Sequence, residues 1–452
     1  MLAKLHAKLG DFWWYSLMLF CACRAADLLN AFVGLWLVPK YVGTEELGAV
    51  MPLTQFANFL AIPVAAFANT FRNELTRLSI SKEFGKLKTL MRGVFAATAV
   101  FLFIAIIVAR FVLPAFLERI RIVEGSLGLV IIAASFVSAV APIYSNALQA
   151  LKKFKAQSLL SIVGAPVRLI AMLITMPFRA ITGYFIGQAA TPAFSIVASV
   201  FALRKELSVK AEPYWNKTTF RKFSALFALF VLMAGSGGFL GLVESTIIRQ
   251  RLPDLDSAGY YMATRFSEIA TYLYSAMIFA FFPFAAELAK NGMEHAKLIL
   301  KSTGVNITFC LSIALVFCFI SKPILAFLPH GDKYSSYWWA IPWLIVITGI
   351  SSLHGFYTTA EIAAGRFGFL KWAMPLDLSY PALLLLATGH GYLVGTIPAT
   401  LTDFLTTHNI YSLETILWWM TAITIIKALA CLGAMTSAKL RTSACINDIR
   451  QT

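Results

Sequence analysis

Six ionisable side chains interrupt long apolar segments of this chain and are the residues best placed to do chemistry. They are Arg24, Asp27, Arg168, Arg265, Glu268 and Lys427. An ionisable residue at the centre of a bilayer costs about 2.5 to 3.5 kcal/mol on insertion scales, so it tends to face a bundle interior or a water-filled cavity. Four of the six are basic, and guanidinium groups match phosphate oxygens geometrically. The pattern therefore favours a cavity that binds an anion.

A purely structural reading of the same charges stays open. Arg24 with Asp27, and Arg265 with Glu268, are three residues apart and share a helix face, so each base could simply neutralise its neighbour. Arg168 and Lys427 have no such neighbour along their own segments, so an excess of two positive charges still favours an anion.

The elements that position these residues follow from composition. Of 452 residues, 59% are apolar and only 13% are charged, which is too apolar for a water-facing globule. A spanning helix needs about 20 mostly apolar residues, and on that criterion the sequence predicts an all-α polytopic membrane protein with twelve spans. The spans lie near 13–37, 48–70, 91–113, 127–148, 157–177, 183–203, 223–248, 258–284, 303–328, 338–362, 371–389 and 413–436.

Basic residues concentrate on one side of this predicted topology. The loops near 71–92, 149–156 and 204–222 are rich in Lys and Arg, which places them, and both termini, in the cytoplasm. The net charge of +16 is then explained by short loops beside anionic headgroups, and no nucleic-acid partner is expected.

The chain also repeats itself. Gly48 and Gly259 are 211 positions apart, and "VLPAFL" (112–117) matches "PILAFL" (323–328) at the same offset. We therefore predict two six-helix lobes, 1–212 and 213–452, as parallel repeats around a central cavity. The second lobe carries an outer-face insertion near 389–412, either an interfacial helix or a loop on the bilayer surface.

Enzymatic motifs are missing from the sequence. It has no Walker A motif, no HExxH and no paired-cysteine metal motif. We therefore expect a non-enzyme with no cofactor, no metal and no catalytic residue. The energy for transport would come from an ion gradient, from the membrane potential or from consumption of the product.

Three stretches carry a family resemblance. "YVGTEELGAVMPLTQFANFLAIP" (41–63) resembles the turn joining the first two helices of polysaccharide-transport flippases in the multidrug/oligosaccharidyl-lipid/polysaccharide (MOP) superfamily, and 244–290 and 322–337 resemble later parts of those proteins. The resemblance implies a MATE/MOP-like fold in a bacterial inner membrane. It also implies a polyprenyl-pyrophosphate-linked oligosaccharide as cargo, moved from the inner to the outer leaflet by alternating access.

The resemblance further implies site residues and partners. Arg24 and Arg265 fit the roles of basic cavity residues that hold the pyrophosphate, with Arg168 and Lys427 as further candidates. Membrane lipids and other polysaccharide-assembly membrane proteins are the expected partners. Glu244 departs from the family, which more often has Asp or Asn there.

Two other functions remain open. A MATE-like drug/cation antiporter would use Asp27, Glu244 or Glu268 as an ion-coupling acid. A peptidoglycan lipid-precursor flippase is the second alternative. The glycine-rich stretch "AGSGGFLG" (234–241) is either a hinge or a site of close helix packing.

Overall fold

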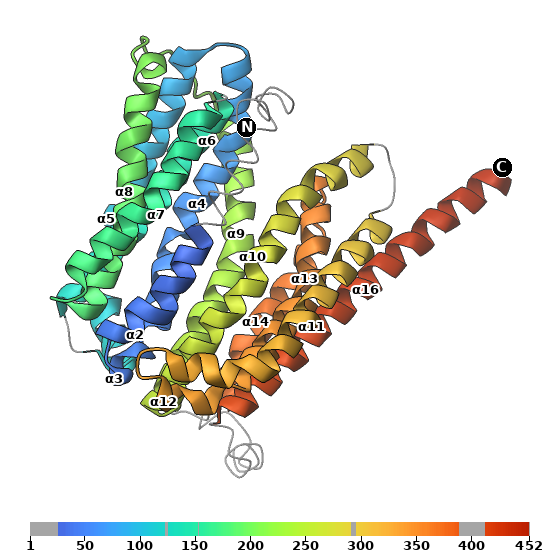
Figure 1. The fold of residues 1–452 in the computed structure, drawn as a ribbon. Helices are drawn as coiled ribbons and strands as arrows, with labels where there is room; N and C mark the ends of the chain where they lie inside the picture. Colours follow the sequence, from blue (N-terminus) through green and yellow to red (C-terminus); the bar gives the residue numbers. More distant parts are fainter. Residues whose placement is uncertain (1–25, 123–124, 152, 291–294, 388–411, 452) are drawn as a thin grey trace, which may run out of the picture. The chain divides into compact units, whose positions relative to one another are not determined.

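The computed structural model describes residues 26–451 except 123–124, 152, 291–294 and 388–411 (Figure 1). The regular elements of these residues are all helices, which confirms the all-α prediction. The chain forms two compact units, Met1–Gln250 and Arg251–Thr452.

The first unit begins with a helix that is described from residue 26 onward. This helix passes through a π-helical turn, η1 (Val33–Leu37), into α2 (Val38–Tyr41), and is followed by the single turn α3 (Thr44–Leu47). The long helices are α4 (Val50–Ile80), α5 (Phe84–Arg119), α6 (Gly125–Ala150), α7 (Phe154–Thr175), α8 (Ala180–Leu207) and α9 (Lys217–Arg251).

The second unit has the same kind of construction. Its long helices are α10 (Asp254–Lys290), α11 (Ala296–Phe327), α13 (Ala340–Ala363), α14 (Leu370–Ala387) and α16 (Leu413–Gln451). The short α12 (Gly331–Tyr334) and the 3-10 turn η2 (Ser335–Tyr337) connect α11 to α13.

Helix packing follows the sequence repeat. In the first unit α6 packs against α4 and α8, and in the second unit α13 packs against α10 and α16, which are the equivalent helices. Helix α7 packs on α8 as α14 packs on α16. The contacts of α9 group it with the first unit, although the repeat makes it the first helix of the second half. The lobe boundary after residue 212 therefore stays a prediction of the repeat.

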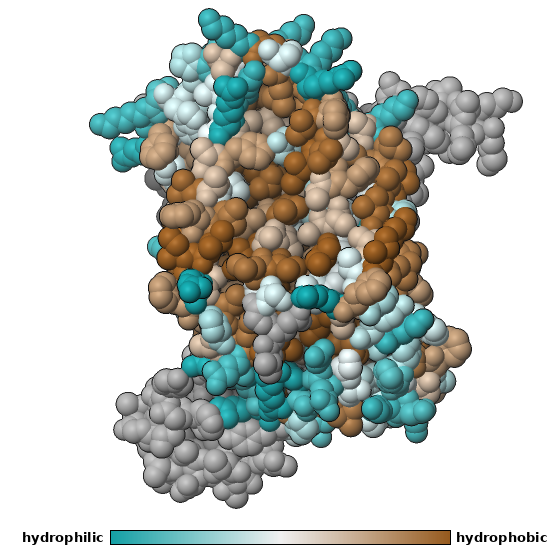
Figure 2. All heavy atoms as spheres, turned by 90° about the vertical axis from the view of Figure 1, so that its left-hand side faces the viewer, coloured by the Kyte–Doolittle hydropathy of each residue, from teal (hydrophilic) through white to brown (hydrophobic). Residues whose placement is uncertain are grey.

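Nine helices among the described residues are long and apolar enough to cross a membrane. On the first unit, large apolar side chains are exposed in rows, as on α5, where Phe103 is 65% and Phe111 76% exposed. Figure 2 shows such a face, with an apolar middle and hydrophilic side chains gathered toward its two ends. Exposure of this extent indicates a lipid-facing surface, so the chain is a multi-pass membrane protein.

The prediction that residues 71–92 form a loop is largely wrong. Helix α4 continues to Ile80 and α5 begins at Phe84, so three residues make the turn, with Lys82 in the left-handed conformation at φ 58°. The extension is helical because Phe71, Leu75 and Leu78, spaced four and three apart, continue the buried stripe of α4 beyond its apolar span.

The glycine-rich stretch of α9 is part of one continuous helix in the first unit. A Cβ atom added at Gly238 would lie 2.5 Å from Cδ1 of Ile62, and one added at Gly241 would lie 3.1 Å from Oε1 of Gln55. Both neighbours are on α4. The side chains of Ile62 and Gln55 on α4 therefore leave little room for a side chain at these two glycines.

The repeated Gly259 also has a packing reason. A side chain there would collide with the ring of Tyr337, which lies in η2 outside the spans. The Tyr337 hydroxyl donates a hydrogen bond to the Asp256 carboxylate at the start of α10. Burial, and then the hydrogen bond to Asp256 and its charge, raise the pKa of Tyr337 above its ordinary value. The contact ties the N-terminal end of α10 to the turn before α13.

Candidate substrate-binding site

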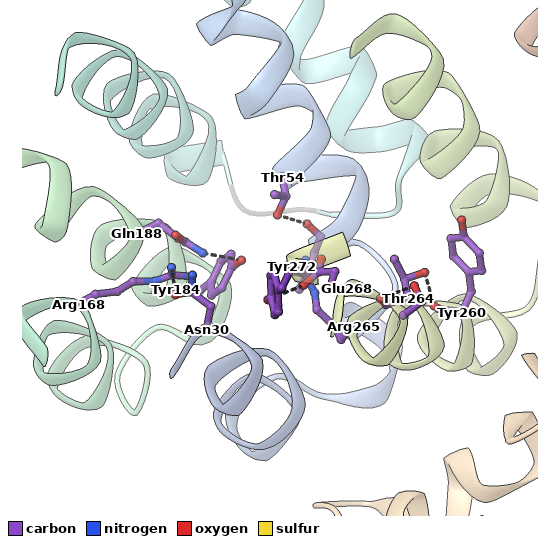
Figure 3. A network of polar contacts seen from close by, with 12 residues as sticks. Asn30, Thr54, Arg168, Tyr184, Gln188, Tyr260, Thr264, Arg265, Glu268 and Tyr272 are labelled. Carbon is purple, nitrogen blue, oxygen red and sulfur yellow. Dashed lines mark hydrogen bonds and ion pairs between the residues drawn. The ribbon is translucent and has the colours of Figure 1, made fainter. Parts of the chain in front are cut away.

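The first unit has a partly open cavity of about 450 Å³ between its first helix, α6, α7 and α8, and most of the residues that line it are polar. Two of the predicted site residues, Asp27 and Arg168, line it. Nη1 of Arg168 on α7 donates to Oδ1 of Asn30 on the first helix at 2.5 Å (Figure 3). Asp27 stands three residues before Asn30, on the same face of that helix. The structure therefore brings an acid, an amide and a base to one cavity.

Helical periodicity explains how three further helices line this cavity. On α7, Gln157, Ser161, Ala165 and Arg168 recur every three or four residues and so share one face. The lining residues of α6 and α8 follow the same spacing: Ser138, Ala141 and Ser145 on α6, and Gln188, Thr191, Ser195 and Ser199 on α8. Small side chains at these positions leave the space open. Sequence reasoning singled out Gln188 as a polar residue that could contact a sugar but missed the serines of this set, although the spacing of small and polar residues in three predicted spans is their signal.

A second cavity of about 100 Å³ adjoins the first. Ser138 and Gln188 line both, and Asn58 of α4 and Tyr184 of α8 line only the smaller one. Nε2 of Gln188 donates to the Tyr184 hydroxyl at 2.7 Å, as Figure 3 shows. Polar groups therefore extend across the first unit from α7 to α4.

In the second unit, one face of α10 carries a row of two charged and two tyrosine side chains. Tyr261, Arg265, Glu268 and Tyr272 follow one another at intervals of three or four residues, so they lie on one face of the helix. Nη1 of Arg265 lies 2.7 Å from Oε1 of Glu268, and its guanidinium stands 4.9 Å from the ring centre of Tyr261. The hydroxyl of Tyr272 donates to Oε2 of Glu268 at 3.4 Å (Figure 3). The predicted pairing along this helix is therefore present.

Lys427 on α16 has an acidic partner on another helix. Its Nζ lies 2.5 Å from Oδ1 of Asp377 on α14, and both side chains are less than one-fifth exposed. Nearby, Sγ of Cys431 lies 3.6 Å from Nδ1 of His354. Sequence reasoning missed Asp377, because spacing along one helix says nothing of a partner on the next. Its charge reduces the excess of basic residues on which the anion prediction rested.

Of the remaining predicted residues, the structure describes Glu244 but not Arg24. Glu244 on α9 is buried in the first unit. Arg24, and nearly all of the insertion near 389–412, lie outside the described residues.

The comparisons with known proteins bear on the fold. No family model matches the sequence, and no curated protein matches it. Among solved structures, an inward-facing multidrug resistance MATE family transporter of the MOP superfamily aligns over 92% of this chain and 95% of its own, with a TM-score of 0.65 and 11% identity. The chain has the fold of these transporters.

Two further structures agree with that fold. A mutant of a MATE transporter from Vibrio cholerae covers 98% of this chain and 97% of its own at a TM-score of 0.60 and 16% identity. The lipid II flippase MurJ, in an inward closed conformation, covers 94% and 100% at a TM-score of 0.59 and 14% identity. These neighbours are transporters and a flippase, and their low identities leave the cargo to be argued from the residues of this chain.

Proposed function

We propose that this protein is a flippase for a polyprenyl-pyrophosphate-linked oligosaccharide, a repeat unit of the O-antigen, capsule or exopolysaccharide kind. It moves the cargo from the inner to the outer leaflet of a bacterial inner membrane by alternating access, with both termini in the cytoplasm. The fold supports a transporter, and one protein with this fold is a lipid II flippase. The resemblance of the first hairpin and of α10 to polysaccharide-transport flippases supports the choice of cargo.

The observation that carries this proposal is the Arg265–Glu268 pair. Arg265 is permanently charged, and its partner is a carboxylate on the same helix at 2.7 Å. A carboxylate that a guanidinium already holds is poorly suited to bind a cationic drug. The guanidinium can instead exchange the carboxylate for a phosphate group, whose oxygens accept the same kind of charge-assisted hydrogen bond and can do so in a bidentate way.

The surroundings of Arg265 suit such an exchange. The ring of Tyr261 gives the guanidinium a neutral support that stays in place when the carboxylate is displaced. The hydroxyl of Tyr272 donates to Glu268 and can keep this carboxylate hydrogen-bonded in the loaded state. Glu268 then returns to Arg265 when the cargo leaves, so the acid acts as a placeholder for the pyrophosphate.

The other basic residues would complete the capture of the pyrophosphate. Arg24, Arg168 and Lys427 are the further ligands that we propose from the sequence. Lys427 is held by Asp377, so it too would exchange a carboxylate for the cargo. The polyprenyl tail would stay in lipid while the saccharide passes through the protein.

Two alternatives have specific support. A MATE-like drug/cation antiporter is favoured by the fold of the MATE neighbours and by the carboxylates Asp27, which lines the cavity, and Glu244, which is buried. A peptidoglycan lipid-precursor flippase would use the same anion chemistry, and the similarity of the fold to that of the lipid II flippase MurJ supports this alternative.

Deletion of the gene and reconstitution of the protein test the proposal together. Deletion should cause a lipid-linked saccharide to accumulate on the inner leaflet. Purified protein in liposomes should translocate a fluorescent polyprenyl-pyrophosphate saccharide. Transport of a cationic dye against a proton or sodium gradient, without lipid translocation, would establish the antiporter instead.

A further inference from the structure

We propose that the 450 Å³ cavity of the first unit binds a single neutral, hydroxyl-rich ring, a sugar unit. That this sugar is part of a lipid-linked cargo rests on the proposed function, whereas its binding to the cavity does not. The inference adds a second recognition site, for the saccharide, inside one unit of the chain. It also moves Arg168 from the proposed pyrophosphate ligands to the sugar, so that Arg24, Arg265 and Lys427 remain for the pyrophosphate.

Gln157 is the residue that points to a missing ligand. It lines the cavity, and its side chain is 7% exposed. Nε2 donates to Oγ of Ser145 at 3.0 Å, but Oε1 has no hydrogen-bond partner among the described residues. Buried amide oxygens are nearly always paired, so a donor from outside the chain is expected here. A hydroxyl both donates and accepts, and it would satisfy the amide in either of its two orientations.

The rest of the lining matches the same ligand chemistry. Ser161, Ser195 and Ser199 contribute hydroxyls, and Asn30 and Gln188 contribute amides. Each of these groups can both donate and accept, as a ring bearing several hydroxyls requires. The volume lies within the range of small-molecule sites.

The charges of the cavity argue against a simple ion as its ligand. Asp27 and Arg168 both line it, so an anion would meet the carboxylate and a cation would meet the guanidinium. A neutral ring can donate one hydroxyl to Asp27 while another accepts from Arg168. Both interactions are charge-assisted hydrogen bonds, which are stronger than neutral ones.

The adjoining 100 Å³ cavity offers space for a substituent of the sugar ring. It shares Ser138 and Gln188 with the main cavity and adds the amide of Asn58. A small polar group, such as an N-acetyl arm, would find donors and acceptors there.

A pair of matched variants on α8 tests the cavity. Ser195→Phe places a ring in the cavity, whereas Val197→Phe adds a ring of similar size to the exposed face of the same helix, where Val197 is 56% exposed. The full chain is reconstituted in nanodiscs, and thermal unfolding is followed with free hexoses, 6-deoxyhexoses, N-acetylhexosamines, sodium chloride and sodium pyrophosphate.

We expect at least one neutral sugar to raise the unfolding temperature of the wild type and of Val197→Phe but not of Ser195→Phe. If no sugar of the panel does so, or if the shift persists in Ser195→Phe, the proposal is overturned. It is also overturned if only sodium or pyrophosphate gives a shift that Ser195→Phe removes.

Gln157→Met keeps the proposal testable if Ser195→Phe does not fold. Methionine has a similar length; it loses the hydrogen bond to Ser145 but also removes the unpaired amide oxygen, so the variant should fold about as well as the wild type. It should weaken sugar binding by roughly tenfold, as expected for one hydrogen bond. Unchanged sugar affinity would contradict the role of Gln157.

The two proposals fail separately in these experiments. The sugar measurement uses free sugars and no lipid-linked saccharide. A sugar shift without translocation of the lipid-linked saccharide would therefore contradict the flippase proposal and leave the sugar site in the cavity supported. Translocation of the lipid-linked saccharide without a sugar shift would support the flippase and contradict the sugar site. Uptake of the free labelled sugar into proteoliposomes would overturn its assignment to a lipid-linked cargo.

Discussion

The guanidinium of Arg265 lies 2.7 Å from the carboxylate of Glu268, one turn further along α10, and above the ring of Tyr261. An arginine held this way is either a ligand that waits for an anion or a charge that only neutralises an acid. The two roles predict different export when Arg265 and Glu268 are both replaced: export stays low if Arg265 binds the anion and recovers if it only neutralises Glu268.

Replacing Arg265 tests the first role. Arg265→Ala should reduce export by at least about tenfold, the value of one charge-assisted contact, while the protein stays in the membrane. Arg265→Lys should restore part of it, because lysine keeps the charge and loses the bidentate fork. Recovery of export in the double variant Arg265→Ala with Glu268→Ala would show that Arg265 only neutralises its neighbour. Glu268→Gln is the severe change if the protein is an antiporter.

Arg24 offers the same test in the other half of the repeat. Arg24→Ala should abolish glycan export if this residue also holds the pyrophosphate. Export is then compared with that of Arg24→Ala combined with Asp27→Ala, with membrane abundance measured by immunoblot. A double variant that exports normally would remove Arg24 from the proposed anion site.

The Lys427–Asp377 pair should be coupled in stability. Asp377→Ala leaves the Lys427 ammonium in a site where its side chain is 17% exposed, and loss of one partner of a buried pair typically costs about 3 to 5 kcal/mol. The double variant Asp377→Leu with Lys427→Met should recover most of that loss. Thermal unfolding in detergent measures both. Equal destabilisation by the single and double variants would mean that the unpaired charge of Lys427 does not cause the loss of stability.

The sequence could predict the spans, the repeat and the charged face of α10, because these depend on composition and on spacing along one helix. It could not predict partners across helices. Asp377 was overlooked for this reason, and the Arg168–Asn30 contact joins residues 138 positions apart. Apolarity also marks only the part of a helix inside lipid, so the extension of α4 to Ile80 was taken for a loop.

The cavity of the first unit shows what the same spacing rule could have revealed. The small and polar residues that recur every three or four positions in α6, α7 and α8 were available in the sequence as three stripes. Which stripes face one another is set by packing of α6 and α7 against α8, and periodicity alone does not contain that information.

The predicted orientation can be checked with single cysteines in a chain whose native cysteines are replaced. Ser81 is exposed in the short turn between α4 and α5, and Ser81→Cys should react with a membrane-impermeant thiol reagent only after lysis. A cysteine at position 403, within the predicted outer insertion, should react in intact spheroplasts. The opposite pattern would invert the topology, including the placement of both termini.

Two adjacent glycines of α9 separate close packing from a hinge. A Cβ atom at Gly238 would lie 2.5 Å from Ile62, whereas one at Gly237 would meet nothing within 4 Å. Glycine inside a helix is about 0.8 to 1.0 kcal/mol less favourable than alanine. Gly237→Ala should therefore raise stability by about that amount, and Gly238→Ala should gain less or lose stability because Ile62 must move.

Export decides between the two roles of this stretch. If the glycines serve packing alone, Gly237→Ala should export at the wild-type rate, and Gly238→Leu should fail through poor folding, seen as low abundance and a lowered unfolding temperature. If α9 bends during transport, both alanine variants should fold well and export slowly, because alanine stiffens the helix wherever it replaces glycine. Slow export by a well-folded Gly237→Ala protein would therefore contradict the packing interpretation.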